Sequence, residues 1–267
     1  MINLFVGFIF SGIIAAIAYK KKSLSLSGAA AAVFLGSFMF YFGGWVASAL
    51  MVSFFVSSSV LTLLFNGKKK KTEKLHEKGG RRDALQVFAN GGIGLLFAAL
   101  FHYSRNPLFL LCCAVSFGES NGDTWASEIG VLSKKAPISI LTGKRIERGV
   151  SGGISPLGTL AALAGSTFMA GVFFCMYFLV YGYNKIMPLG LIIISILGFL
   201  GTLIDSILGA SIQAQYFCQE ENLITEKKDY GGKSNKLIKG FRFFNNDMIN
   251  FLSNALSSSV VFLLLGR

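Results

Sequence analysis

The chain has 267 residues, of which 53% are hydrophobic and only 14% are charged, whereas soluble domains carry about 25% charged residues. Uncharged runs such as residues 28–65 and 186–204 are long enough for the ~20 apolar residues with which a helix crosses a bilayer. These features exclude a soluble globular protein. Because no alternating barrel pattern occurs, they predict an all-α, polytopic membrane helix bundle.

Eight apolar segments follow one another along the chain. They cover residues 2–19, 27–42, 45–65, 85–104, 107–130, 157–181, 187–211 and 247–265. The first segment lacks a basic start and is followed by three lysines, so we interpret it as a span rather than as a cleaved signal peptide. The fifth carries polar residues from Glu119 onward. We therefore predict a single transmembrane domain over residues 1–267.

Lys and Arg residues are distributed unevenly between the predicted loops. Of the 25, 22 lie in the loops on one side of an eight-span protein, residues 20–26, 66–84, 131–156 and 212–246. Only Arg105, Lys185 and Arg267 fall on the other side. Since cytoplasmic loops carry an excess of Lys and Arg, we predict that the basic loops are cytoplasmic and that both termini lie outside. In a prokaryote the membrane would be the cell membrane.

The formal net charge of +12 calls for no nucleic-acid partner. Topology and attraction to anionic lipid account for positive loops of this kind, and the alternative is that some of the cations bind phosphates. Lys68 to Lys71 have no glycine or helix start beside them, so we interpret this run as topology and lipid-surface charge.

Four aspartates reach the same predicted depth, the cytoplasmic edge of the membrane. Asp83 and Asp247 begin spans from the inside, and a helix-capping role would explain their positions. Asp123 and Asp205 instead lie far along the fifth and seventh segments, both of which start outside. At a rise of about 1.5 Å per residue, each of these two segments has crossed about 24–27 Å where it reaches its aspartate. A charge there costs a few kcal/mol, so we interpret Asp123 and Asp205 as functional.

Side-chain oxygens recur at helical spacing around these aspartates. The three faces are Asp83, Gln86 and Asn90; Glu119, Asp123 and Ser127, with Glu128 nearby; and Asp247, Asn250 and Asn254. They contain neither His nor Cys, and hard oxygen ligands suit Mg²⁺ or Ca²⁺ rather than zinc. Mg²⁺ uses one or two carboxylates together with substrate phosphates, so these faces point to a phosphate-handling metal site.

Two basic, glycine-rich stretches precede predicted spans. Gly79-Gly80-Arg81-Arg82 stands before the fourth segment, and the stretch from Lys144 to Gly153 stands before the sixth. Glycine-rich backbone at a helix start, with cations beside it, can bind an anion, although a flexible basic loop has the same composition. No Walker A pattern occurs in the sequence.

Five stretches, in chain order, carry a family resemblance. They are Gly80–Gly92, Asn121–Gly130, Gly149–Thr159, Asp205–Ala210 and Asn245–Leu252. They resemble the membrane family catalogued as domain of unknown function ninety-two, or the transmembrane protein nineteen family, which includes the plant phytyl-phosphate kinase. The block from Gly122 to Gly130 is also similar to the motif of CTP-dependent polyprenol and phytol kinases and of CDP-diacylglycerol synthases. The resemblance implies nucleoside triphosphate chemistry, with CTP the first candidate.

Residues and resemblance together predict a Mg²⁺-dependent kinase that uses a nucleoside triphosphate to convert an isoprenoid (phytyl or prenyl) monophosphate to the diphosphate. Its active face would be cytoplasmic. We assign catalytic and metal-binding roles to Asp123, Asp205 and Asp247, with Glu128 as a further metal ligand. The predicted phosphate- and substrate-binding residues are Arg82, Lys144, Arg145, Arg148, Asn90, Ser127 and Asn250.

Two other functions use some of the same features. A membrane transporter has broken spans and intramembrane charges, but it should carry polar residues near the midplane and often an inverted repeat. A CTP–lipid cytidylyltransferase would share the metal and nucleotide features and release pyrophosphate. Both remain alternatives at this point.

Overall fold

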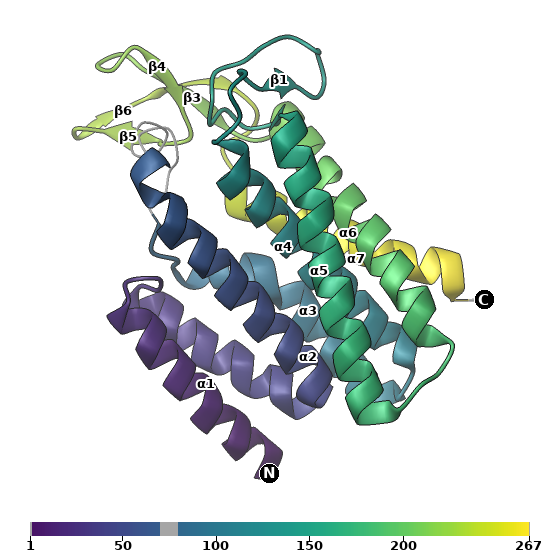
Figure 1. Cartoon of the computed structure of the whole chain (residues 1–267). Coiled ribbons are helices and arrows are strands. Elements are labelled where there is room, and N and C mark those ends of the chain that lie inside the picture. Colours follow the sequence, from purple (N-terminus) through teal and green to yellow (C-terminus); the bar gives the residue numbers. More distant parts are fainter. Residues whose placement is uncertain (1, 70–79, 267) are drawn as a thin grey trace.

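In a computed structural model, which describes residues 2–69 and 80–266, the described chain forms a bundle of seven α-helices (Figure 1). The helices are α1 (Ile2–Lys20), α2 (Leu26–Lys69), α3 (Ala84–Ser104), α4 (Pro107–Gly130), α5 (Pro156–Tyr181), α6 (Ile186–Ser211) and α7 (Asn246–Leu265). Six of these, all except α4, are long and apolar enough to cross a membrane. The predicted all-α, polytopic membrane bundle is confirmed.

Helix α2 consists of two arms that meet at Gly44. This residue has a φ of 58° and a ψ of −150°, which breaks the helix and which glycine adopts without a steric penalty. A Cβ on Gly36 would lie 3.2 Å from the Cε of Met51, so the arms run back along each other (Figure 1). The two arms correspond to the predicted segments 27–42 and 45–65. The described helices therefore account for all eight apolar segments.

Helix α4 lies at the centre of the bundle. It packs against α2, α3, α5, α6 and α7, and every residue from Leu110 to Gly122 is buried. Its polar side chains therefore face other helices rather than lipid, where unsatisfied polar groups cost several kcal/mol. This position explains how the least apolar of the helices can belong to a membrane bundle.

Small residues bring α4 close to its neighbours α5 and α6. A Cβ on Gly165 would lie 3.1 Å from the backbone oxygen of Asn121. A Cβ on Gly122 would lie 2.6 Å from Oγ of Ser166 and 2.9 Å from Cγ2 of Thr202. Close backbone approach of this kind is how membrane helices gain van der Waals contact, and here it holds α4 against α5 and α6.

The loops contain short antiparallel strands that the sequence did not predict. A pair is formed by β1 (Ile138–Ser139) and β2 (Gly153–Ile154), and another by β5 (Asp229–Tyr230) and β6 (Lys233–Ser234). A three-stranded sheet has β3 (Gln215–Cys218) between β4 (Leu223–Thr225) and β7 (Lys236–Lys239). Strands this short cannot carry an alternating pattern long enough to be recognised.

The described parts of the basic loops gather at one end of the bundle (Figure 1). A backbone bridge between Leu24 and Arg82 joins the loop after α1 to the segment before α3. Ser151 Oγ donates to Oε1 of Gln213 at 2.7 Å, which joins the loop before α5 to the loop after α6. The basic loops therefore share one end of the bundle, as the topology prediction requires. The assignment of this end to the cytoplasm stays a prediction.

Candidate functional site

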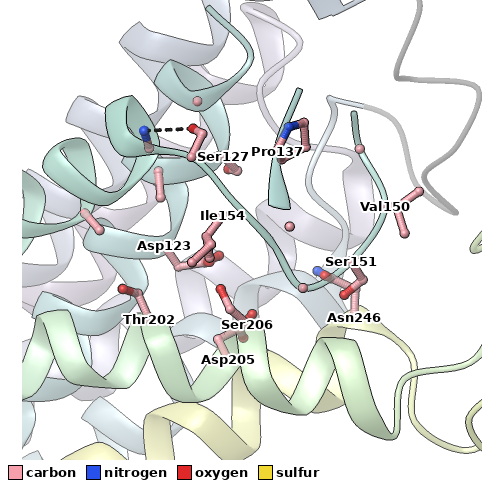
Figure 2. A pocket seen from close by; sticks show the side chains of 18 of the residues that line it. Asp123, Ser127, Pro137, Val150, Ser151, Ile154, Thr202, Asp205, Ser206 and Asn246 are labelled. Carbon is pink, nitrogen blue, oxygen red and sulfur yellow. Dashed lines mark hydrogen bonds between the residues drawn. The ribbon is translucent and has the colours of Figure 1, made fainter. Parts of the chain in front are cut away.

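A cavity of about 350 Å³ opens at the strand-bearing end of the bundle, among α4, α5, α6 and the start of α7. Asp123 from α4, Asp205 from α6 and Asp247 from α7 all line it. Figure 2 shows Asp123 and Asp205 approaching the same space from two helices. The structure thus brings together three carboxylates that lie far apart in the chain.

Helical spacing supplies further oxygens to the same wall. Thr202 and Ser206 line the cavity on either side of Asp205 along α6 (Figure 2). Ser127 lies one turn beyond Asp123 on α4 and also lines the cavity. The capping residue of α7 is Asn245, whose side chain accepts from the backbone N–H of Met248. This cap leaves the carboxylate of Asp247 facing the cavity.

The glycine-rich stretch before α5 forms another wall. Residues 148–155 line the cavity, and Gly149 and Gly152 have φ values of 87° and 79°. Gly152 also lies against α6, since a Cβ there would be 2.7 Å from the Cα of Ala210. Only glycine combines the positive φ with this close approach. The backbone of this stretch is therefore held at the cavity edge by α6 itself.

The cations predicted from this stretch separate into two groups. Arg148 lines the cavity and is anchored by its Nη2, which donates to the backbone oxygens of Ser133 at 2.6 Å and Lys134 at 3.0 Å. Lys144 and Arg145 are exposed in the turn between β1 and β2 and do not line the cavity. Their predicted phosphate contacts would require the turn to move.

Arg82 and Glu128 lie on a different side of α4 from Asp123. Thr62 Oγ1 of α2 donates to Oε1 of Glu128 at 2.7 Å. Burial lowers the pKa of the Arg82 guanidinium, and the negative charge of Glu128 opposes that shift. The helical step from Asp123 to Glu128 corresponds to a rotation of about 140°, so these two carboxylates cannot share a face. We therefore leave Glu128 out of the proposed metal site.

The remaining predicted residues support the aspartate cavity, line another cavity, cap a helix or fall outside the residues that the structure describes. Asn250, with its amide nitrogen turned toward acceptors, donates to Oδ2 of Asp205 at 3.1 Å and so positions a carboxylate. Asn90 donates from Nδ2 to the backbone oxygen of Gln86 and lines a second, apolar cavity. Asp83 is the capping residue of α3, with Gln86 completing a capping box. Gly79, Lys70 and Lys71 fall outside the described residues.

A buried polar network behind Asp205 was missed by sequence reasoning. Glu119 is only 1% exposed, and its two carboxylate oxygens accept from Ser253 Oγ at 2.7 Å and from Asn254 Nδ2 at 2.5 Å. Ser116 Oγ in turn donates to Oδ1 of Asn254 at 2.6 Å. The signals in the sequence were Glu119 at the head of the α4 stripe and the Ser- and Asn-rich face of α7.

The comparison with known proteins agrees with this architecture. The family described as "Integral membrane protein DUF92" matches residues 9–258. The chain belongs to this family. All five stretches that carry the resemblance lie inside the matched region. The DUF92 chain is therefore an integral membrane protein.

Relatives of this DUF92 chain come from plants, archaea and cyanobacteria. Protein PGR of Arabidopsis thaliana is 33% identical over 94% of this chain and 92% of its own length. An uncharacterized membrane protein of Methanocaldococcus jannaschii is 32% identical over 84% of this chain and 89% of its own. Protein VTE6, chloroplastic, of Arabidopsis is 28% identical over 90% of this chain and 65% of its own. No solved structure matches the chain.

The donor atoms of the cavity suit a hard divalent cation. In the described part of the chain, no three His, Cys, Asp or Glu side chains form a group that could hold a metal ion by themselves. The cavity instead offers separate carboxylates at Asp123, Asp205 and Asp247, together with the hydroxyls of Thr202 and Ser206. This set fits Mg²⁺, which is commonly held by one or two carboxylates and completed by water and substrate phosphates.

Proposed function

We propose that this DUF92 protein is a Mg²⁺-dependent kinase that converts an isoprenoid monophosphate to the diphosphate, with CTP as the first candidate donor. The observation that carries the proposal is the convergence of Asp123, Asp205 and Asp247 on one cavity at the basic end of an apolar bundle. A substrate with an apolar chain and a phosphate head would meet both of its preferred environments there. The family resemblance, which extends to the plant phytyl-phosphate kinase, supports the reaction class.

The reaction requires the protein mainly to position the two substrates and to neutralise the charge of their phosphates. An oxygen of the acceptor phosphate would attack the terminal phosphorus of the donor, and the bond from that phosphorus to its bridging oxygen would break. The products are an isoprenoid diphosphate and a nucleoside diphosphate. Because the attacking oxygen is already anionic, little general-base help is needed, and most of the rate gain comes from alignment.

The residues of the cavity divide these tasks. One or two of the carboxylates of Asp123, Asp205 and Asp247 would hold Mg²⁺, with water and phosphate oxygens as its other ligands, and the bound ion would neutralise and orient the phosphates. Arg148 would add a positive charge at the rim. Backbone N–H groups of residues 149–153 would donate to phosphate oxygens, except that of Val150, which donates to the backbone oxygen of Glu147. Asn250 would keep Asp205 in the orientation that the site requires. Sequestration of the reaction among packed helices would limit hydrolysis by water.

The decisive test is a product analysis with purified protein in lipid nanodiscs. The protein is incubated with Mg²⁺, labelled nucleoside triphosphates and a panel of prenyl alcohols and prenyl monophosphates. We expect prenyl diphosphate and nucleoside diphosphate from a monophosphate acceptor, and no product with Asp205→Asn. If no acceptor and donor pair is turned over by the folded wild-type protein, the kinase proposal is wrong.

One alternative has specific support in the sequence. The block from Gly122 to Gly130 is similar to the motif of CDP-diacylglycerol synthases, so a CTP–lipid cytidylyltransferase would use the same cavity. It would form a CDP-lipid and release pyrophosphate. The product analysis separates the two reactions directly, because the label of an α-labelled nucleotide enters the lipid only in the second.

A further inference from the structure

A second cavity, of about 80 Å³, lies between α1, α2 and α3. Apolar side chains dominate its wall, with Ile14 from α1, Leu35 and Val52 from the two arms of α2, Val87 from α3 and Phe117 from α4. Water gains little in such a space, since it finds too few polar partners. The cavity is therefore suited to a hydrocarbon.

One end of this apolar cavity carries a cation. Arg82 lines it, and its guanidinium lies 5.8 Å from the ring centre of Phe54 and 5.7 Å from that of Phe55. Its Nη1 is buried and has no hydrogen-bond partner among the described residues. Leaving a buried donor unsatisfied costs free energy, most of all when the group is charged. The position therefore favours a ligand with an anionic oxygen at the end of an apolar chain.

The two cavities share a wall residue. Gln86 lines both the aspartate cavity and the apolar cavity. From Arg82, the apolar cavity follows α3 to Gly91, a stretch that spans about 13 Å at the rise of a helix. A single-chain ligand in the apolar cavity would place its head between Arg82 and Gln86, at the wall shared with the aspartate cavity, and its chain among the helices.

We propose that the α1–α2–α3 cavity binds the first part of the isoprenoid chain of the acceptor, with Arg82 contacting its phosphate head. The small volume admits one chain, so the occupant is a single-chain anionic isoprenoid lipid and not a two-chain phospholipid. The inference rests on the proposed function for the identity of the acceptor. It adds the chain-binding site and makes this cavity the determinant of acceptor selectivity.

Cavity-filling variants test the site through acceptor selectivity. Ala32→Phe and Val52→Phe each place a ring in the cavity, whereas Val56→Phe makes the same change at a position that is 49% exposed and does not line it. With a series of prenyl monophosphates of increasing chain length, we expect each cavity variant to lower the long-to-short ratio of kcat/KM at least tenfold. Val56→Phe should leave that ratio unchanged. An unchanged ratio in a folded, monodisperse Val52→Phe protein would overturn the inference.

A binding measurement keeps the site separate from the kinase proposal. A prenyl phosphate with a diazirine on its chain is photo-crosslinked to the wild-type protein, and the labelled peptides are mapped. We expect labels on α1, α2 and α3, reduced by unlabelled prenyl phosphate and not by phosphatidic acid. Such labelling without turnover of any acceptor would keep the site and reject the kinase. Turnover with labels only on other helices, or equal competition by phosphatidic acid, would reject the chain-binding site.

Discussion

Oγ of Ser253 in α7 lies 2.7 Å from Oε1 of Glu119 in α4, although the two residues are far apart in the chain. The same oxygen lies 3.1 Å from Oδ2 of Asp205 in α6. A hydroxyl has one hydrogen, so it can donate to only one of these carboxyl groups at a time. Ser253 therefore couples the buried network to the cavity aspartate, and the orientation of Asp205 depends on three helices.

Removal of the Ser253 hydroxyl should disturb Asp205 without removing a carboxylate. We expect Ser253→Ala to lower kcat/KM about tenfold to hundredfold, as for the loss of a hydrogen bond of about 1.5–3 kcal/mol to a charged group. The control is Ser259→Ala on the same helix, at an exposed position, with thermal stability measured in parallel. Equal activity of the two variants would show that the network does not position Asp205.

The cavity carboxylates should be indispensable for turnover and dispensable for folding. We expect Asp123→Asn and Asp205→Asn each to abolish activity while the protein remains monodisperse, and excess EDTA to abolish the activity of the wild type. Asp229→Asn provides the same chemical change at an exposed residue of β5, whose carboxylate accepts from Ser234. Full activity of Asp205→Asn, or activity that persists in EDTA, would remove that residue or the metal from the proposal.

The positions of the loop cations predict different kinetic effects. Arg148→Gln should lower kcat/KM about tenfold to hundredfold, because Arg148 lines the cavity and a charge-assisted phosphate contact contributes about 1.5–3 kcal/mol. Arg145→Gln is the matched change in the exposed turn, and it should alter kcat/KM less than threefold. An equally large loss in Arg145→Gln would mean that the β1–β2 turn closes over the substrate.

The fold could be predicted because membrane spans are marked by length and composition. All eight apolar segments have a helical counterpart, and the adjacent Gly43 and Gly44 explain the break that divides α2. Strands β3, β4 and β7 could not be predicted in the same way. β3 and β4 are consecutive but too short to show a pattern, and β7 pairs with β3 from a distance in the chain, as Gln215 does with Lys239.

The candidate site was predictable where one helix carries the information. The helical rise along the segments that form α4 and α6 predicted one depth for Asp123 and Asp205, and the structure places both on one cavity. Glu128 lies close to Asp123 in sequence, but helical rotation turns it toward Thr62 and away from the aspartate cavity. The contact of Glu119 with Ser253 depends on how α4 and α7 pack, which no single segment encodes.

The orientation of the bundle can be tested by labelling from outside. Single cysteines are introduced at position 235, near the strands, and at position 183, in the loop between α5 and α6, in a background without native cysteines. We expect an impermeant maleimide to label intact cells at position 183 only, because the basic loops should be cytoplasmic. Labelling at position 235 would invert the topology and place the aspartate cavity outside.

The glycine-rich wall of the cavity can be tested by two alanine substitutions with different steric surroundings. Gly143 has a φ of 66° with no atom within 4 Å of an added Cβ, so Gly143→Ala should cost only the backbone strain of about 1–2 kcal/mol. Gly152 has a φ of 79°, and its added Cβ would also clash with Ala210, so Gly152→Ala should push residues 149–153 away from α6. We expect both variants to lower the denaturation midpoint by a few degrees, and only Gly152→Ala to lower kcat/KM, by about tenfold or more.

Parallel measurement of thermal denaturation and turnover separates the effect of backbone strain from that of displacing the glycine-rich stretch. If both variants lost activity in proportion to their stability, the glycine-rich stretch would be contributing to folding and not to the binding of phosphate.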